Sequence, residues 1–137
     1  MWILFALLSA VFAALTSILA KIGIENINSN LAVAIRTVVV LLLAWGIVFI
    51  TGKHHDIINM DRKNILFLVL SGFATGLSWL CYYRALQIGE ASKVIPIDKF
   101  SVVIGMVLAF IVLKDTVTRN AIIGGVLITA GTFVLIL

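Results

Sequence analysis

The stretch WLCYYRALQIGEASKVIPIDKFSVVIGMVLAF, from Trp79 to Phe110, decides the fold, because it is two apolar segments that meet at a short polar turn. Aromatic and ionisable side chains and the only proline gather around that turn: Trp79, Tyr82, Tyr83, Arg84, Pro96, Asp98 and Lys99. In a soluble protein they would form an ordinary mixed surface. In a chain that crosses a membrane, an ionisable side chain at membrane depth is costly and marks a candidate functional site.

The composition of the whole chain favours the membrane. Of its 137 residues, 63% are hydrophobic and 12% are charged, whereas soluble domains average about 45–50% apolar and about 25% charged residues. A soluble domain of this size cannot bury so much apolar surface, so the bilayer is the expected solvent. The net charge of +4 does not indicate nucleic-acid binding, because the basic residues lie mainly in the turns between apolar runs.

Five apolar runs predict an all-α membrane protein with five transmembrane helices. Each run is close to the roughly 20 residues that a helix needs to cross the hydrocarbon core. The runs do not alternate as the strands of a membrane β-barrel would, and the short connections leave no room for a soluble domain. The expected single transmembrane domain spans 1–137, with helices at about 2–20, 31–50, 65–86, 94–113 and 120–137.

Two basic residues lie at or within the first two predicted helices, and each has two interpretations. Lys21 ends the first helix, where it either extends to the membrane interface or lines a polar cavity. Arg36 follows Asn30, the expected N-cap of the second helix, by about 9 Å of helix. It either reaches the interface or faces inward to meet an anion or a carboxylate.

The end of the third predicted helix is aromatic. Trp79, Tyr82 and Tyr83 have i, i+3, i+4 spacing and therefore share a helix face. They form either an aromatic belt at the membrane interface or the wall of a ligand site. Arg84 follows directly and would line or gate that site.

The fourth predicted helix depends on Pro96. If Pro96 stands in the first turn, Asp98 lies near the helix N-terminus, where the helix dipole favours an anion. If the helix begins earlier, at Ser92 or Val94, Pro96 breaks it within the membrane, and the freed backbone groups form a polar site. Asp98 and Lys99 are adjacent, so on a regular helix they should have different partners.

Other patterns are better explained by packing or by solvation. Gly72 and Gly76, and the face of Ala121, Gly125 and Thr129, permit close helix contact or dimerisation. Cys81 is the only cysteine, which excludes an intramolecular disulfide and a cysteine-based zinc site. The triplet 54–56 (His-His-Asp) lies in the longest polar loop, so we expect no metal, no cofactor and no catalytic residues.

In order along the chain, several motifs together resemble a single EamA-type unit of the drug/metabolite transporter superfamily. They are the small-residue first helix ending in Lys21, LAVAIR with Arg36, WLCYYRAL before the polar turn and Pro96, and LKDTVTRNAIIGGVLITAG from Leu113 to Gly131. Members of that superfamily commonly have two such units and ten helices, so the resemblance implies a dimer. The family often has Gly-Glu where this chain has Lys114 and Asp115.

The basic residues divide weakly between the two sides of the membrane. The side of the N-terminus would hold Lys53, Arg62, Lys63, Lys114 and Arg119, and the other side Lys21, Arg84 and Lys93, with Arg36 and Lys99 deeper. So small a bias permits insertion in both orientations. An antiparallel homodimer would then reproduce the inverted repeats common in secondary transporters, and a parallel dimer or a paralogous partner is the alternative.

We therefore expect a non-enzymatic secondary transporter or exporter of a small metabolite or amphipathic compound, acting as a dimer by alternating access in a bacterial or archaeal cytoplasmic membrane. Excess base over acid at membrane depth hints at an anionic or zwitterionic substrate. The alternatives are a helper subunit that does not transport, and a pore, although no ring of like charge is visible. The expected substrate-binding residues are Arg36, Trp79, Tyr82, Tyr83, Asp98 and Lys99, with Lys21, Arg84 and Pro96 gating or lining the cavity.

Overall fold

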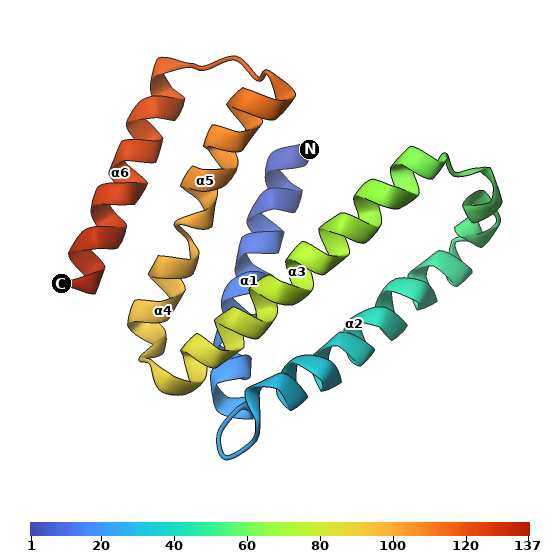
Figure 1. Ribbon diagram of the computed structural model, residues 1–137, viewed down its shortest axis with the longest axis horizontal. Coiled ribbons are helices and arrows are strands. Elements are labelled where there is room, and N and C mark those ends of the chain that lie inside the picture. Colours follow the sequence, from blue (N-terminus) through green and yellow to red (C-terminus); the bar gives the residue numbers. More distant parts are fainter. The chain divides into compact units, whose positions relative to one another are not determined.

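The computed structural model describes residues 1–137 and is entirely helical (Figure 1). Five segments are long and apolar enough to cross a membrane, which confirms the five expected apolar helices. Four of them are the continuous helices α1 (Trp2–Gly23), α2 (Ser29–Ile50), α3 (Arg62–Ile88) and α6 (Arg119–Ile136). The remaining one is interrupted and consists of α4 (Ala91–Asp98), α5 (Ser101–Leu108) and the π-helical turn η2 (Ala109–Leu113).

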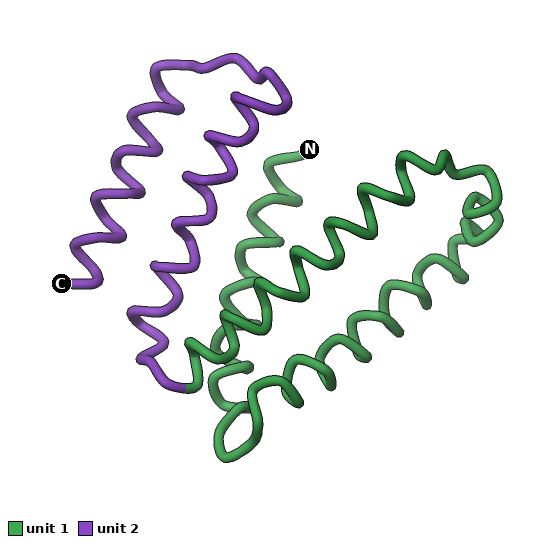
Figure 2. The backbone as a smooth tube through the Cα atoms, in the orientation of Figure 1, with its two compact units in different colours: residues 1–87 green, residues 88–137 purple.

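The chain divides into two compact units, residues 1–87 and residues 88–137, which are coloured separately in Figure 2. Unit 1 holds α1, α2 and nearly all of α3. Unit 2 holds α4, α5, η2 and α6. Each unit is described by itself.

In unit 1, the second helix begins earlier than the sequence suggests. Asn28 is its N-cap, because the Asn28 Oδ1 accepts hydrogen bonds from the backbone N–H groups of Asn30 at 2.8 Å and Leu31 at 3.4 Å. The prediction of Asn30 as the N-cap was therefore wrong by two residues. The loop after α2 contains a short 3₁₀ helix, η1 (Lys53–Asn59), preceded by Gly52 in the left-handed region at φ +69°.

The buried side chains of unit 1 gather at one end. They come from the last residues of α1 and the turn after it, the first of α2 and the last of α3: Ser17, Ala20, Ile24, Ser29, Val33, Tyr83 and Leu86. Towards their other ends the three helices expose large apolar side chains. Such exposure is stable in lipid, whose tails are as apolar as leucine, so only the packed end needs specific contacts.

In unit 2, the membrane segment is broken near its middle. Pro96 is the sixth residue of α4, so the interpretation that places it in the first turn was wrong. Without an N–H, proline cannot donate to the carbonyl four residues before it, and its ring crowds that turn. The helix ends two residues later at Asp98, and bonds of the shorter i to i+3 type follow, from the Phe100 N–H to the Ile97 carbonyl and from Val102 to Lys99, each 3.0 Å.

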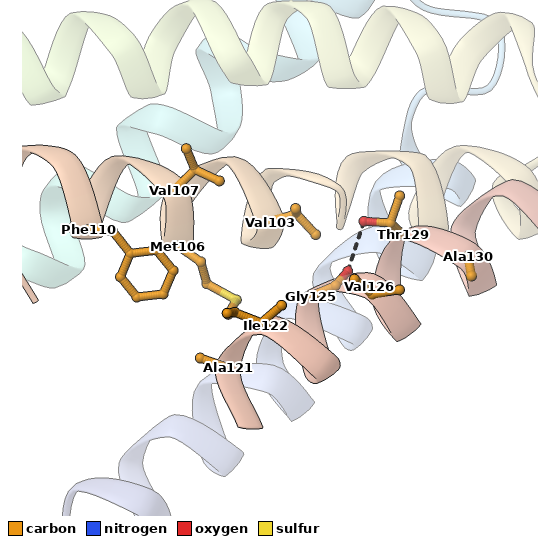
Figure 3. A pocket seen from close by; sticks show the side chains of 10 residues that line it. All are labelled: Val103, Met106, Val107, Phe110, Ala121, Ile122, Gly125, Val126, Thr129 and Ala130. Carbon is orange, nitrogen blue, oxygen red and sulfur yellow. Dashed lines mark hydrogen bonds between the residues drawn. The ribbon is translucent and has the colours of Figure 1, made fainter. Parts of the chain in front are cut away.

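After η2 the chain turns at Lys114, whose φ of +56° is left-handed, a conformation that favours glycine. Thr118 caps α6, because its hydroxyl accepts a hydrogen bond from the Ala121 N–H at 3.2 Å. The small face of α6 then lies towards α5, with Met106 reaching it (Figure 3). A methyl group added at Gly125 would meet the Met106 Cε at 3.9 Å, an ordinary contact distance.

Candidate functional site

The centre of the polar cluster in unit 1 is Arg36 of α2. Its Cζ lies 4.2 Å from the ring centroid of Trp79 and 5.5 Å from that of Tyr83, both on α3. Arg36 stands seven residues into α2, roughly 10 Å along the helix. A guanidinium over an aromatic face is attracted by the ring quadrupole, and the attraction grows as water is removed. Arg36 thus turns towards α3 and contacts the rings of Trp79 and Tyr83, and its meeting with an anion or a carboxylate stays a prediction.

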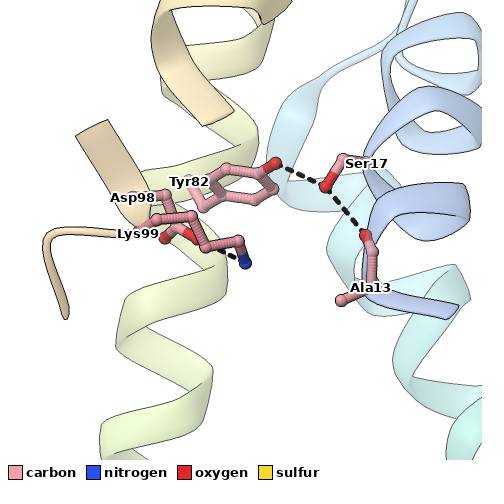
Figure 4. Close-up of polar contacts among 5 residues, drawn as sticks. All are labelled: Ala13, Ser17, Tyr82, Asp98 and Lys99. Atoms are coloured by element: carbon pink, nitrogen blue, oxygen red, sulfur yellow. Dashed lines mark hydrogen bonds and ion pairs between the residues drawn. The ribbon is translucent and has the colours of Figure 1, made fainter. Parts of the chain in front are cut away.

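Tyr82 faces a different helix. Its hydroxyl donates a hydrogen bond to the Ser17 Oγ of α1 at 2.8 Å, and Ser17 donates in turn to the Ala13 carbonyl at 3.0 Å (Figure 4). Ser17 is 5% exposed, so this pair is shielded. Ser17 was not singled out from the sequence, although small residues in the first helix favour close helix contact.

The three aromatic residues therefore do not form one open wall. Trp79 and Tyr83 contact Arg36, whereas Tyr82 contacts Ser17. Tyr83 is 3% exposed, so its contact with Arg36 is on the buried side, while Trp79 is half-buried and accessible. The rings of Tyr82 and Tyr83 meet edge to face at 6.4 Å.

The end of α3 is tied to α1 and to the turn that follows it. The Lys21 Nζ donates to the carbonyl of Leu86, one of the last carbonyls of α3. A cation at this place also opposes the negative end of the helix dipole. Lys21 lines a cavity of about 420 Å³ with residues of the same turn and with Gln87. Whether Lys21 gates or lines a transport cavity stays a prediction.

Arg84 and Gln87 form a second tie. The Arg84 Nη1 donates to the Gln87 Oε1 at 2.8 Å, and the Gln87 Nε2 donates to the Ile27 carbonyl at 2.6 Å. Gln87 was not singled out from the sequence, since a lone glutamine near a helix end carries no distinctive pattern. Arg84 is exposed and does not contact Arg36. Through Gln87 its side chain is linked to the turn between α1 and α2.

In unit 2, Asp98 and Lys99 pair with each other. The Lys99 Nζ lies 3.5 Å from the Asp98 Oδ2 (Figure 4). The expectation of different partners was wrong, because Asp98 ends α4 and Lys99 lies in the break, where the regular helix spacing no longer separates neighbours. Asp98 stands at a helix C-terminus, where the dipole disfavours an anion, and Lys99 offsets this.

The His-His-Asp triplet lies in η1. The ring of His54 lies tilted against the rings of His55 and Phe49, with centroid distances of 4.0 Å and 5.3 Å. No group of three or more histidine, cysteine or acidic residues comes together in the structure. The described geometry therefore brings together Arg36, Trp79 and Tyr83 as one cluster in unit 1 and keeps Asp98 with Lys99 in unit 2.

Comparisons with known proteins give the family. A relative from a Sinorhizobium species, named an uncharacterized transporter in the cobO 3' region, is 43% identical over 134 residues, which cover 98% of this chain and 95% of the relative. An uncharacterized protein of Methanocaldococcus jannaschii is 32% identical over 133 residues, 97% of this chain and 94% of that protein. No solved structure matches the chain significantly.

The EamA-like transporter family matches residues 1–137. Five candidate membrane helices agree with an integral membrane protein. This chain therefore belongs to the EamA-like transporter family, a family of membrane transporters and not of enzymes.

Proposed function

We propose that the chain is a secondary transporter of a small metabolite or amphipathic compound, and that two copies form a ten-helix dimer working by alternating access. The observation that carries the proposal is the Arg36 guanidinium, 4.2 Å from the Trp79 ring centroid within apolar helices. An arginine costs several kcal/mol in lipid by the lower estimates. Retaining it there is understandable if a solute meets it.

The interrupted helix in unit 2 supports the proposal of a transporter. Transporters place discontinuous helices at their substrate sites, since unwound backbone offers polar groups there. Here Pro96 and the Asp98–Lys99 pair stand at such a break. We assign Asp98 and Lys99 to the substrate pathway together with Arg36, Trp79, Tyr82 and Tyr83, and we give Lys21, Arg84 and Pro96 gating or lining roles.

A second copy is supported by what the units leave uncovered. Unit 2 has one buried side chain, Thr132, and many of its large apolar side chains are exposed. The alignments cover 97–98% of this chain and 94–95% of the two relatives, so those relatives are about as long as this chain. We favour an antiparallel homodimer because the basic residues are nearly balanced between the two sides. The bacterial and archaeal relatives support the cytoplasmic membrane as the location.

The test is a release assay with purified protein. Liposomes are loaded with a defined mixture of amino acids, organic acids, nucleotides and sugars, and mass spectrometry follows what appears outside. We expect selective release of a few compounds, lost in the Arg36→Gln variant and kept in Asp61→Asn. That control alters an exposed charge just before α3 and leaves the basic residues that set the orientation unchanged. Release no different from that of protein-free liposomes would contradict the proposal.

One observation favours the alternative of a helper subunit. Gly72 and Gly76 lie on a groove of α3 where an added methyl group would meet nothing within 4 Å, so another helix could approach closely. A helper subunit would tolerate Arg36→Gln and Asp98→Asn but fail with Gly72→Leu or Gly76→Leu. The transporter predicts loss of function with the polar variants.

A further inference from the structure

The N–H groups of Arg36 donate no hydrogen bond, and in this Arg36 differs from the other two basic residues near this end of unit 1. Lys21 donates to the Leu86 carbonyl and Arg84 donates to Gln87. Arg36 forms neither a hydrogen bond nor an ion pair, and its contacts are with the rings of Trp79 and Tyr83. It is half-buried, so part of the guanidinium remains accessible.

The geometry of these contacts shows which chemistry would complete the site. A guanidinium offers a flat face and an edge with five N–H donors. The rings occupy the face, with the nearer centroid 4.2 Å from Cζ, and leave the edge. The partner that matches an arginine edge with two parallel hydrogen bonds is a carboxylate or a phosphate.

The acids of unit 1 do not supply that partner. Glu25 lies in the turn after α1, Asp56 in η1 and Asp61 just before α3, and none of them forms an ion pair. In unit 2, Asp98 is already paired with Lys99 at 3.5 Å. N–H donors without a hydrogen-bond partner at membrane depth cost free energy. A ligand that carries an oxyanion would satisfy the donors of Arg36 and would therefore be favoured.

We propose that the edge of Arg36 binds the carboxylate or phosphate of a small amphipathic molecule whose apolar part lies against Trp79. This inference rests on the proposed function and names the substrate class of the same site. The oxyanion has two possible sources, a free metabolite or the headgroup of an anionic lipid, and the experiment separates them.

Trp79 can report on the site directly. The chain has three tryptophans, and the other two, Trp2 and Trp45, are 77% and 40% exposed. In the full-length Trp2→Phe/Trp45→Phe variant, purified in maltoside micelles that contain no phosphate, Trp79 is the only tryptophan. Its emission is titrated with benzoate and phenyl phosphate, with benzyl alcohol and benzyltrimethylammonium as neutral and cationic controls, and separately with short-chain phosphatidylglycerol.

We expect a saturable change in Trp79 emission with benzoate or phenyl phosphate and none with the two control compounds. Arg36→Gln should weaken binding by about ten- to a hundredfold, the usual effect of losing hydrogen bonds to a charged group. Arg36→Lys should retain part of the affinity, because a lysine keeps the charge without the paired donors. Lys63→Gln should bind as the parent does. A response to phosphatidylglycerol alone, lost in Arg36→Gln, would assign the oxyanion to a lipid headgroup.

The inference is overturned if no anion changes the Trp79 emission, if the neutral or cationic probe binds equally well, or if Arg36→Gln binds anions undiminished. Circular dichroism and gel filtration show whether each variant is folded, and Arg36→Lys tests the charge if Arg36→Gln is not. This binding assay needs no transport. Anion binding without selective release from liposomes would sink the proposed function alone. Selective release of neutral or cationic compounds, lost in Arg36→Gln but without anion binding, would sink the inference alone.

Discussion

Tyr82 and Tyr83 are neighbours in the chain with different physical roles. The Tyr82 hydroxyl donates to Ser17 and joins α3 to α1, whereas Tyr83 contributes its ring to Arg36 and its hydroxyl donates no hydrogen bond. Adjacent residues on a helix point about 100° apart, so one pair of tyrosines reaches two neighbouring helices. This difference can be measured by removing one oxygen atom at a time.

Tyr82→Phe should lower the free energy of unfolding by about 0.6–1 kcal/mol, the usual value of a hydrogen bond between membrane helices. Ser17 keeps its own donor engaged with Ala13, so no buried donor is left unpaired. Unfolding in mixed micelles by increasing dodecyl sulfate measures the change. Tyr83→Phe is the matched control and should have a smaller effect; equal losses would show that the hydroxyl bond to Ser17 adds nothing.

At the scale of single elements, the turn after η2 places a lysine, Lys114, in the left-handed backbone region. Lys114 has φ +56°, and a residue with a side chain pays about 1–2 kcal/mol in that region. The family pattern that this chain resembles often has glycine there, which is the residue that the conformation favours.

Lys114→Gly should therefore stabilise the protein by about 1 kcal/mol, measured by the same unfolding curves. The control is Lys93→Gly in α4, where glycine should destabilise by up to about 1 kcal/mol because the residue is helical. If both glycines destabilise, the turn does not hold the left-handed conformation in the membrane.

The broken membrane segment is the second element with a testable cause. Pro96→Ala restores an N–H that can donate to the Ser92 carbonyl, so a more continuous helix is expected. Amide hydrogen exchange of residues 97–102 should slow relative to the parent in nanodiscs, while Ile97→Ala should leave it nearly unchanged. Unaltered exchange in Pro96→Ala would assign the break to the residues around Phe100 and not to the proline.

Asp98 belongs to the same break. If it carries a proton during transport, Asp98→Asn should abolish proton-coupled flux of any compound released by the parent, measured with a pH-sensitive dye inside liposomes. The control is Glu90→Gln, which removes an exposed acid just before α4 and outside the proposed site, and which should retain proton flux. Full proton-coupled flux in Asp98→Asn would refute the coupling role.

At the scale of the whole molecule, the balance of basic residues would set how the two copies of the proposed dimer are oriented in the membrane. Lys53, Arg62 and Lys63 lie in or beside the loop between α2 and α3, on the side expected for the N-terminus. Changes of one or two charges in short loops can reverse the orientation of a weakly biased protein. An antiparallel dimer then needs both orientations.

Reporter fusions after Leu137 should show that the parent has its C-terminus on both sides of the membrane. Ile58→Lys with Val117→Lys should fix one orientation, and Lys53→Gln with Arg62→Gln should favour the other. Each variant alone should lose the release activity, and co-expression of the two should restore it. A single orientation in the parent, or activity in one fixed variant alone, would rule out the self-complementary antiparallel dimer.

The membrane class and the five apolar helices followed from local properties of the chain. Length and hydropathy of each run are sufficient for that prediction, because a helix in lipid satisfies its own backbone hydrogen bonds. Arg36, Trp79, Tyr82 and Tyr83 could also be selected as candidate site residues, since a charge or a large ring at membrane depth is visible residue by residue, and their role in substrate binding stays a prediction. Helix ends were less predictable: Asn28 and Asn30 differ only in which side chain reaches the free N–H groups.

Partners were decided only by the tertiary structure, because they join residues far apart in the chain. The bonds from Lys21 to Leu86 and from Tyr82 to Ser17 span 65 positions each, and no local pattern encodes such a pairing. The Asp98–Lys99 pair arises because the helix ends between the two residues. Periodicity is a property of regular helix, so the residues at its interruption had to be located in three dimensions.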